Sequence, residues 1–200
     1  MPVPPEEQEL ARRIRARDAE ALRCVVEEHA GILYRAARGV GLDEEMARDT
    51  AQECLLTFLE RAEAFEGRSR VRTWLFGILY RKIHETRRRV RRDTEHDPID
   101  DAIEKRFDWR GAWARPPSDP GVGLTAERLR AHLAECLEPV PERQRSAFLL
   151  REVDGLTSEE ICKVLEVSRT NLGVLLFRAR HRLRECLEGK GITGSHDAAV

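Results

Sequence analysis

The sequence contains no apolar run long enough to cross a membrane. The stretch "LGVLLF" at 172–177 is among the longest, whereas a spanning helix needs about 20 apolar residues. The first ten residues, "MPVPPEEQEL", are acidic and lack the apolar core of a secretory signal. We therefore expect a cytoplasmic protein without membrane insertion. The 200 residues are 41% hydrophobic and 36% charged, a balance typical of a globular chain and not of a disordered one.

The sequence also lacks the motifs of catalysis. "HETRR" at 84–88 has no second histidine that would make the zinc motif H-E-x-x-H. There is no Gly-rich phosphate loop, and no serine or cysteine stands in a known nucleophile motif. We therefore expect a protein that is not an enzyme and needs no cofactor.

Paired cysteines are missing too. The cysteines are five in number, scattered, and without a CxxC pair: Cys24, Cys54, Cys136, Cys162 and Cys186. Each stands among apolar residues at helical spacing, which predicts small buried thiols. His181 and Cys186 match no standard zinc spacing with Cys162, so we expect no bound metal. Whether these thiols or the six histidines sense metal or redox state is left open.

No alternating strand pattern extends beyond three or four residues, whereas helical periodicity is present throughout, so we expect an all-α fold. From Asp18, one face carries Leu22, Val25, Val26, His29, Leu33 and Ala36. Gly39 and Gly41 then end this helix. A second amphipathic helix lies within residues 42–65, and a third begins near Val71. Together they predict a small helical bundle over residues 1–92.

Residues 93–124 differ from this bundle in composition. The stretch 93–108 holds seven carboxylates against two basic residues, and "WARPPSDPGVG" follows it. Acidic, Pro- and Gly-rich composition predicts a flexible linker. Its three aromatic residues, Phe107, Trp109 and Trp113, are candidate docking points on a domain or a partner.

A second helical domain is predicted over residues 125–188. Thr157 and Glu160 form a capping-box pattern that starts one helix. A short turn then leads to a longer, basic helix from about Arg169. This layout is typical of a helix-turn-helix. We expect residues 189–200 to be a disordered tail.

Positive charge is concentrated in one short segment. In "RKIHETRRRVRR", at 81–92, seven of twelve residues are Arg or Lys, although the formal net charge of the chain is −1. A solvated helix face is one interpretation of such a run. A surface that binds phosphates is the other.

The order of these segments resembles a known family. "FEGRSRVRTWLFGILYRKIHETRRRVRR", an acidic linker and "VPERQRSAFLLREVDGLTSEEICKVLEVSRTNLGVLLFRARHRLRECLE" are similar to extracytoplasmic-function (ECF) sigma factors. These are small sigma subunits of bacterial RNA polymerase that have only regions 2 and 4. The resemblance covers residues 18–92 and 125–188. It implies binding to core polymerase (the β′ clamp helices and the β flap), to promoter DNA and to an anti-sigma factor.

The resemblance also implies two sites in region 2. Asp49, Gln52 and Glu53 match a D-x-x-Q-E motif that docks on the β′ clamp helices, and they alternate with apolar residues, so we expect them on an exposed face. The loop "EGRSR" and the helix after it would bind the −10 element. The residues assigned to this element are Arg68, Arg70, Trp74, Arg81, Lys82, Arg87, Arg88, Arg91 and Arg92. The spacing of Trp74 equally suits the core, and Arg89 is left open.

Region 4 would read the −35 element as duplex DNA. The assigned residues are Ser168, Arg169, Thr170, Asn171, Phe177, Arg178 and His181, of which Phe177 equally suits the core. The sequence departs from the family at six positions, of which Cys162 in place of alanine is an exchange of small residues. Arg81 and Glu85 replace frequent Asn and Asp, and Gly173 and Val174 replace polar base readers. Glu166 replaces the usual glycine of the turn, where a left-handed conformation would cost about 1 kcal/mol.

The alternative is a stand-alone helix-turn-helix regulator that binds DNA without polymerase, usually as a dimer. Such a regulator needs neither the D-x-x-Q-E motif nor an acidic linker. Both features are present in the sequence, and they favour the sigma factor.

Overall fold

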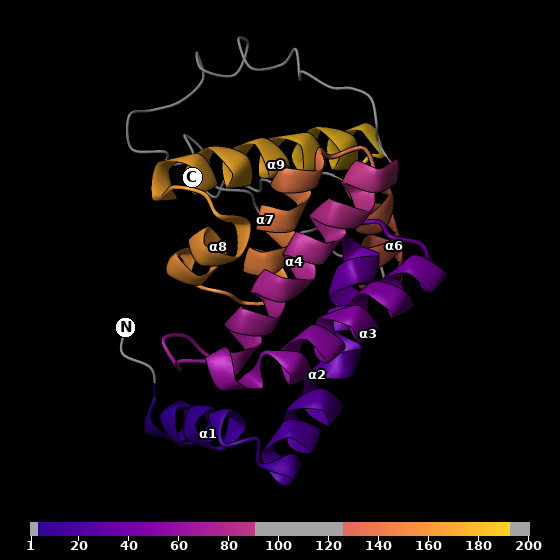
Figure 1. Ribbon diagram of the computed structural model, residues 1–200. Coiled ribbons are helices and arrows are strands. Elements are labelled where there is room, and N and C mark those ends of the chain that lie inside the picture. The colour runs from indigo at the N-terminus through magenta and orange to yellow at the C-terminus, as the bar shows by residue number, and fades with distance from the viewer. Residues whose placement is uncertain (1–3, 91–125, 193–200) are drawn as a thin grey trace. The chain divides into compact units, whose positions relative to one another are not determined.

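The computed structural model describes residues 4–90 and 126–192, and every regular element in these ranges is helical, as predicted (Figure 1). The chain divides into two compact units. The first comprises Met1–Arg92 with Leu149–Arg169, and the second comprises Asp93–Phe148 with Thr170–Val200. The predicted linker with Phe107, Trp109 and Trp113 lies outside the described residues, as do residues 193–200 of the predicted tail. The first residues of that tail are described: Gly189 is the last residue of α9 (Arg169–Gly189), and the Ile192 amide donates to the Leu187 carbonyl at 3.0 Å. No helix in the described part is long and apolar enough to cross a membrane.

Three helices form the bundle of the first unit: α2 (Ala19–Gly39), α3 (Glu44–Glu60) and α4 (Val71–Val90). They pack against one another, and their predicted apolar faces are buried, which confirms the bundle (Figure 1). Asp18 caps α2 by accepting a hydrogen bond from the Ala21 amide at 2.9 Å, and Asp43 caps α3 through the Met46 amide at 2.8 Å. Such caps satisfy backbone donors that would otherwise lack partners.

A further helix, α1 (Pro5–Arg15), was not predicted from the sequence. Its signals are present at low strength: proline stands at the first helical position, Glu6 and Glu7 lie in the first turn, and arginines lie in the last turn. Ala11 and Ile14 are buried on the bundle. Because only these two side chains form its buried face, the apolar pattern was too short to recognise. A 3-10 turn, η1 (Ala62–Ala64), packs against α1.

The first unit also contains α8 (Ser158–Leu165), which packs against α4. The predicted capping box is confirmed. The Thr157 hydroxyl accepts from the Glu160 amide at 3.3 Å, and the Thr157 amide donates to Glu160 Oε2 at 2.9 Å. Ile161, Val164 and Leu165 are buried, as their spacing predicts.

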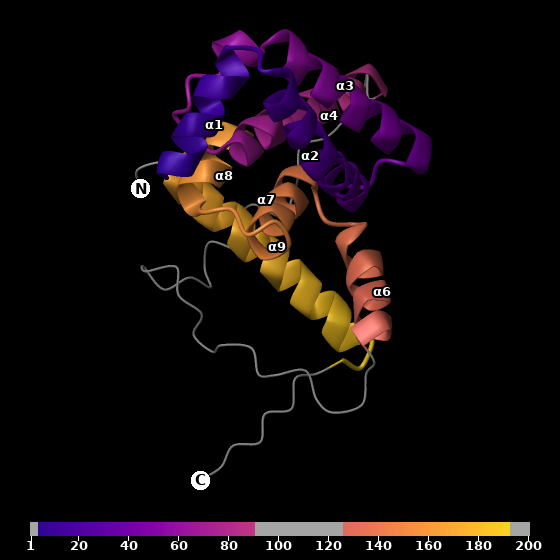
Figure 2. The ribbon, with the colours of Figure 1, turned by 90° about the horizontal axis from the view of Figure 1, so that it is seen from below.

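The second unit is built from α6 (Ala126–Leu137), the first part of α7 (Glu142–Glu152) and α9 (Arg169–Gly189). Figures 1 and 2 both place α6 beside the C-terminal half of α9. Their shared core is small. Cys136, Val140, Ala179 and Leu183 are buried, and Leu137, Phe148, Cys186 and Leu187 pack around them.

The cysteines correct one prediction. Cys136 and Cys186 are joined in a disulfide between α6 and α9, with Cα atoms 5.7 Å apart, and are not free thiols. A separation of 50 residues in sequence gave no pairing signal. Cys54 is a buried thiol, as predicted, and burial raises its pKa to about 12. Cys162 is half-buried. Cys24 is exposed, so the prediction of a buried thiol is wrong at this position too.

Candidate functional site

The D-x-x-Q-E residues lie on the exposed face of α3. Asp49, Gln52 and Glu53 are all exposed, while Thr50, Ala51 and Cys54 between and beside them are buried. This alternation follows from the 3.6-residue helical period, which turns the apolar positions to the bundle and the polar ones outward. The three side chains are therefore accessible to a partner.

An apolar hollow adjoins this polar face. Its volume is about 380 Å³, and it is lined by Ala30, Gly31, Tyr34, Arg48, Ala51, Gln52 and Leu55 of α2 and α3. Leu56, one turn after Gln52, is 59% exposed and is one of two large hydrophobic side chains that are exposed among the described residues. Sequence reasoning missed Leu56 and Tyr34 because both fit an ordinary amphipathic helix. The available signal in the sequence was a leucine, Leu56, four residues after Gln52 and therefore on the same helix face.

Lys82 of α4 links the two predicted sites of region 2. Its ammonium lies 3.3 Å from Glu53 Oε2. Lys82 was predicted to bind promoter phosphate and Glu53 to bind polymerase. In the structure they neutralise each other, with Lys82 mostly covered and Glu53 mostly exposed.

The loop before α4 is held by α1. Gly67 has a φ of +69°, and a Cβ at this position would lie 2.9 Å from Ala11 Cβ. The Val71 amide at the start of α4 donates to Glu7 Oε2 at 3.2 Å. The helix that the sequence did not reveal thus positions the loop and supplies a carboxylate to the α4 N-terminus.

Trp74 lies inside an aromatic group. It stacks on Phe65, with ring centroids 4.8 Å apart, and meets Phe58 edge to face at 5.8 Å. Its side chain is half-buried. In this structure Trp74 packs, which agrees with the second of its two predicted roles.

The predicted arginines of the −10 site differ in how accessible they are. Arg68 and Arg70 are exposed on the loop, and Arg68 pairs with Glu66. Arg81 is exposed and lies 3.6 Å from Glu166 Oε1. Arg87 donates to the Val40 carbonyl, which ties α4 to the end of α2. The side chain of Arg88 is not described, and Arg91 and Arg92 lie outside the described residues.

Two further contacts connect α4 to the segment around α8, within the first unit. Arg72 Nη2 lies 3.5 Å from Asp154 Oδ1, and burial raises the pKa of Asp154 to about 6 despite this cation. The Thr73 hydroxyl donates to Glu160 Oε1 at 2.8 Å. Burial opposes ionisation of Glu160, but hydrogen bonds from Thr157 and Thr73 outweigh it and lower its pKa.

The residues predicted to read the −35 element lie on α9 and directly before it. Ser168, Arg169, Thr170 and Asn171 are all exposed at its N-terminal end. Phe177, Arg178 and His181 are half-buried. The Phe177 and His181 rings lie 6.1 Å apart, and His181 Nδ1 lies 3.4 Å from Glu185 Oε2. The structure thus separates an accessible set from a partly covered one.

The turn before α9 adopts the predicted conformation. Glu166 has φ 54° and ψ 46°, in the left-handed region. Gly173, one turn into α9, is exposed, and an added Cβ would meet nothing within 4 Å. A larger side chain therefore fits at position 173.

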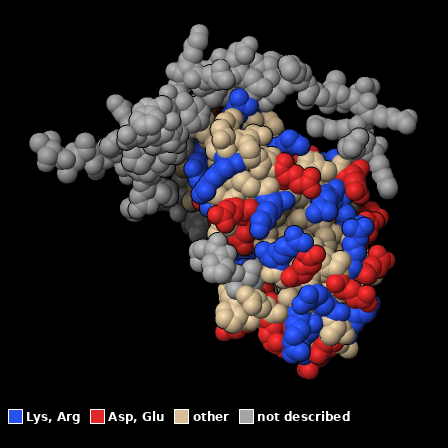
Figure 3. Space-filling view, turned by 60° about the vertical axis from the view of Figure 1, so that its left-hand side comes forward, with Lys and Arg blue, Asp and Glu red and all other residues tan. Residues whose placement is uncertain are grey.

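Basic side chains do not form a separate patch on the face shown in Figure 3. There, Lys and Arg stand next to Asp and Glu. This mixture agrees with the formal net charge of −1. A phosphate bound on this face would therefore lie close to carboxylates as well as to basic groups. Among the described residues no group of three His, Cys, Asp or Glu side chains could hold a metal ion.

Comparison with protein families identifies this architecture. Residues 25–93 match the family "Sigma-70 region 2", and residues 130–183 match the family "Sigma-70, region 4". A curated relative is the "Probable RNA polymerase sigma factor" of Haemophilus influenzae, which is 32% identical over 155 residues, covering 73% of this chain and 79% of the relative. The "ECF RNA polymerase sigma-E factor" of Escherichia coli is 28% identical over 135 residues, covering 68% and 70%.

Solved structures show the same fold. CnrH, solved in complex with the cytosolic domain of CnrY, superposes with a TM-score of 0.65 at 21% identity, over 92% of this chain and 97% of that one. The sigma factor RpoE of Bartonella quintana, solved with the anti-sigma factor NepR, gives 0.61 at 20% identity, over 83% and 96%. The chain belongs to the sigma-70 family of RNA polymerase sigma factors, in its ECF group. The stand-alone regulator is not favoured.

Proposed function

We propose that this sigma factor docks on core RNA polymerase through the exposed face of α3, and that it then directs initiation at a specific class of promoters. One observation carries the docking site: Asp49, Gln52 and Glu53 are exposed, Gln52 also lines the apolar hollow, and Leu56 is exposed one turn later on the same helix. Apolar surface beside a few polar groups is typical of a protein interface. A regulator that binds DNA by itself would have no use for it.

The −10 element is assigned to the loop 66–70 and to α4. Arg68, Arg70 and Arg81 are exposed there and would hold the strand through its phosphates, together with Arg88, Arg91 and Arg92. Arg87 is engaged with the Val40 carbonyl, so we assign it to the support of α4. Lys82 would bind phosphate once Glu53 is taken by polymerase.

The −35 element is assigned to α9. The exposed end from Ser168 to Asn171 supplies short polar side chains, Arg169 and backbone amides for phosphate and base contacts. Gly173 reads no base, but it lets the backbone approach DNA. Arg178 lies further along the same helix, where bidentate binding to guanine would supply about 1–3 kcal/mol of discrimination.

The partners follow from this role. Two structural neighbours were solved with a partner, which for RpoE is named an anti-sigma factor, and we propose that an anti-sigma factor holds this chain as well. Because its task is to serve RNA polymerase, we place it in the cytoplasm. Its work is recognition and assembly, without catalysis of its own.

Run-off transcription tests this function. The purified chain is mixed with bacterial core polymerase and a pool of promoter fragments, and discrete transcripts are expected. Gln52→Ala with Leu56→Ala should abolish them and weaken the binding of core. Glu45→Ala, an exposed change in the first turn of the same helix, is the matched control and should leave both unchanged.

The alternative makes a different prediction for the same samples. If the chain alone shifted duplex DNA while no complex with core formed, the sigma-factor function would be rejected. If core bound but transcripts were unaffected by Arg88→Ala and Arg91→Ala, the −10 assignment would be wrong and the docking assignment would stand.

A further inference from the structure

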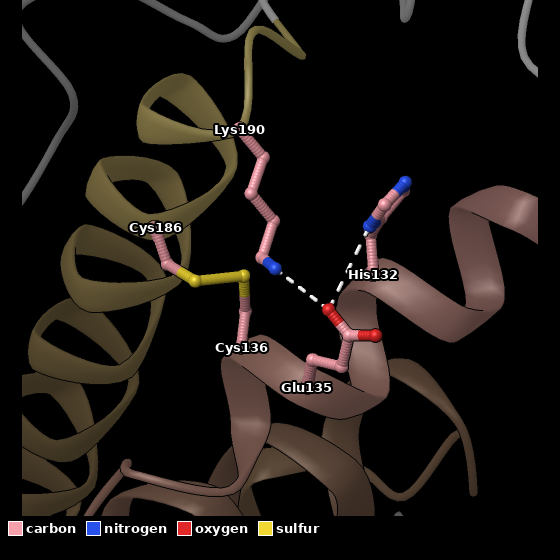
Figure 4. Close-up of a disulfide and its surroundings, with 5 residues drawn as sticks. All are labelled: His132, Glu135, Cys136, Cys186 and Lys190. Atoms are coloured by element: carbon pink, nitrogen blue, oxygen red, sulfur yellow. Dashed lines mark hydrogen bonds and ion pairs between the residues drawn. A yellow bond between two sulfur atoms is a disulfide. The ribbon is translucent and has the colours of Figure 1, made fainter.

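The disulfide of the second unit has no task in the function proposed above. It joins α6 to α9 in a small core, where Cys136 is 1% exposed and Cys186 is half-buried (Figure 4). A protein that works with polymerase in a reducing compartment has little use for a purely structural disulfide. Disulfides in such compartments are usually transient, and they are catalytic or redox-sensing.

The position of the bond limits what it can control. Cys186 follows Arg169 by 17 residues on α9, which is about 25 Å along a helix. The bond therefore does not contact the end assigned to the −35 element. It acts on the attachment of α6 to α9.

Besides the bond, α6 is held by the small apolar core around Ala179 and Leu183 and by polar contacts. Lys190 Nζ lies 2.6 Å from Glu135 Oε2, an exposed ion pair beside the disulfide (Figure 4). This pair lowers the pKa of Glu135. Arg145 Nη1 donates to the Leu137 and Glu138 carbonyls at 3.4 and 3.3 Å. Exposed ion pairs contribute little to stability, so the covalent bond is the strongest constraint at this junction.

We propose that Cys136 and Cys186 form a reversible thiol–disulfide site, whose oxidation fixes α6 against α9 and whose reduction loosens the second unit and thereby weakens binding of the −35 element by α9. The proposal rests on the proposed function for its consequence in transcription. The redox chemistry of the site does not depend on that function.

The oxidation uses a peroxide. Cys186 is the more accessible sulfur, so its thiolate attacks a peroxide oxygen, the O–O bond breaks, and a sulfenic acid forms as alkoxide or hydroxide leaves and takes up a proton. The Cys136 thiolate then attacks this sulfur. The S–S bond forms, the S–O bond breaks, and water is released. In total, two thiols and one peroxide give a disulfide, an alcohol or water, and one water, and a dithiol returns the pair to thiols by exchange.

The remaining cysteines cannot substitute for either partner. Cys24, Cys54 and Cys162 are free, and all three belong to the first unit. Cys54 is buried and donates to the Leu75 carbonyl at 3.4 Å. Cys24 is exposed and serves as an internal control for thiol labelling.

Thiol counting tests the site directly. Under denaturing alkylation and mass spectrometry, the peroxide-treated chain should carry three labels and the dithiol-treated chain five. Intact mass must show the loss of two hydrogens and no dimer, and non-reducing peptide mapping must show the Cys136–Cys186 linkage. When the chain is treated with peroxide and dithiol in alternation, the number of labels should alternate between three and five. Five labels after peroxide treatment, or a bond to Cys24 or Cys162, would overturn the proposal.

The consequence is tested in holoenzyme on a promoter found by the run-off assay. Oxidised chain, freed of peroxide, and reduced chain are compared at equal concentration on a fragment that needs its −35 element. We expect about a tenfold higher concentration of reduced chain for half-maximal transcription, which corresponds to about one-tenth of region 4 being competent. Cys136→Ser/Cys186→Ser should behave as reduced chain under both conditions.

Controls separate redox control from loss of fold. Cys24→Ser/Cys162→Ser should keep the full difference in transcription between oxidised and reduced chain. Glu135→Gln removes only the ion pair, so the ratio of the concentrations that give half-maximal transcription should be the same as in wild type. Circular dichroism at the assay temperature checks that each variant is folded. Oxidised and reduced wild-type chain are also compared, because they differ in redox state alone and carry no substitution. If both forms transcribed equally, the switch would be rejected and the sigma factor would stand. If neither transcribed but the thiols cycled, the redox site would stand and the proposed function would fail.

Discussion

At the residue scale, Glu166 destabilises the fold through its left-handed backbone conformation, as the sequence predicts. It ends α8 in the left-handed region, where glycine is usual in the family. A side chain there costs about 1 kcal/mol. Its carboxylate reaches Arg81 only at 3.6 Å with both side chains exposed, so this ion pair offsets little.

We expect Glu166→Gly to raise the free energy of unfolding by about 0.5–1 kcal/mol, because strain is relieved while the unfolded chain gains some freedom. Urea denaturation followed by circular dichroism measures this change. Glu159→Gly, inside α8, is the control and should destabilise by about 1 kcal/mol. If both substitutions changed the free energy of unfolding equally, the positive φ of Glu166 would not be a source of strain.

Asp154 predicts a pH dependence of stability. Its pKa is raised from 3.8 to about 6 by burial, so between these values the folded chain holds a proton that the unfolded chain has lost. The contribution of Asp154 therefore destabilises progressively as pH rises from about 4 to 6, and its full cost is present above that window. Below pH 4 it vanishes.

Asp154→Asn should accordingly be more stable than wild type at pH 7, by about 2 kcal/mol after allowance for the lost Arg72 pair. The two proteins should converge toward pH 4. Denaturant midpoints between pH 4 and 7 test this, and Glu152→Gln, two residues earlier, serves as control. A constant difference across the range would show that the proton is not involved.

At the scale of elements, the loop before α4 depends on a helix from the start of the chain. Gly67 combines a positive φ with a close approach to Ala11, so any side chain there is strained and displaces α1. We expect Gly67→Ala to destabilise by about 2 kcal/mol. Gly173→Ala, in open space on α9, should instead be neutral or slightly stabilising.

Thermal unfolding of these two variants gives the comparison. If Gly67→Ala were as stable as wild type, α1 would not restrain the loop. Proteolysis near Arg15 should also become faster in this variant, because detached helices expose their backbone.

Most elements could be predicted from the sequence because their signals are local. The helix start at Asp18, the capping box at Thr157, the glycines at the end of α2 and the apolar stripes are signals that act within a few residues. α1 was missed because two buried side chains make a weak stripe. The disulfide was missed because it joins residues 50 positions apart, and such proximity arises only from packing. For the same reason the sequence did not reveal that Arg87 is tied to Val40, or that Lys82 pairs with Glu53.

At the scale of the whole molecule, near neutrality makes promoter binding sensitive to individual arginines. Because the formal net charge is −1, the chain as a whole is not attracted to DNA, and the loss of one arginine–phosphate contact is not compensated. Arg88→Ala should lower the slope of log affinity against log salt by about 0.9 per lost phosphate contact. Holoenzyme binding measured over a range of potassium chloride tests this. Arg12→Ala on α1, where Arg12 is already paired with Glu9, should leave the slope unchanged.

The ion pair between Lys82 and Glu53 couples the two proposed binding events. In the proposed function Glu53 binds polymerase and Lys82 binds promoter phosphate, so while the two are joined each covers the charge of the other. A polymerase that takes Glu53 releases the ammonium for a phosphate, and a promoter strand that takes Lys82 releases the carboxylate for polymerase. By thermodynamic reciprocity, each partner must then raise the affinity for the other by the same factor. One surface contact thus favours the ternary complex over either binary one, and it disfavours a sigma factor held on DNA without its enzyme.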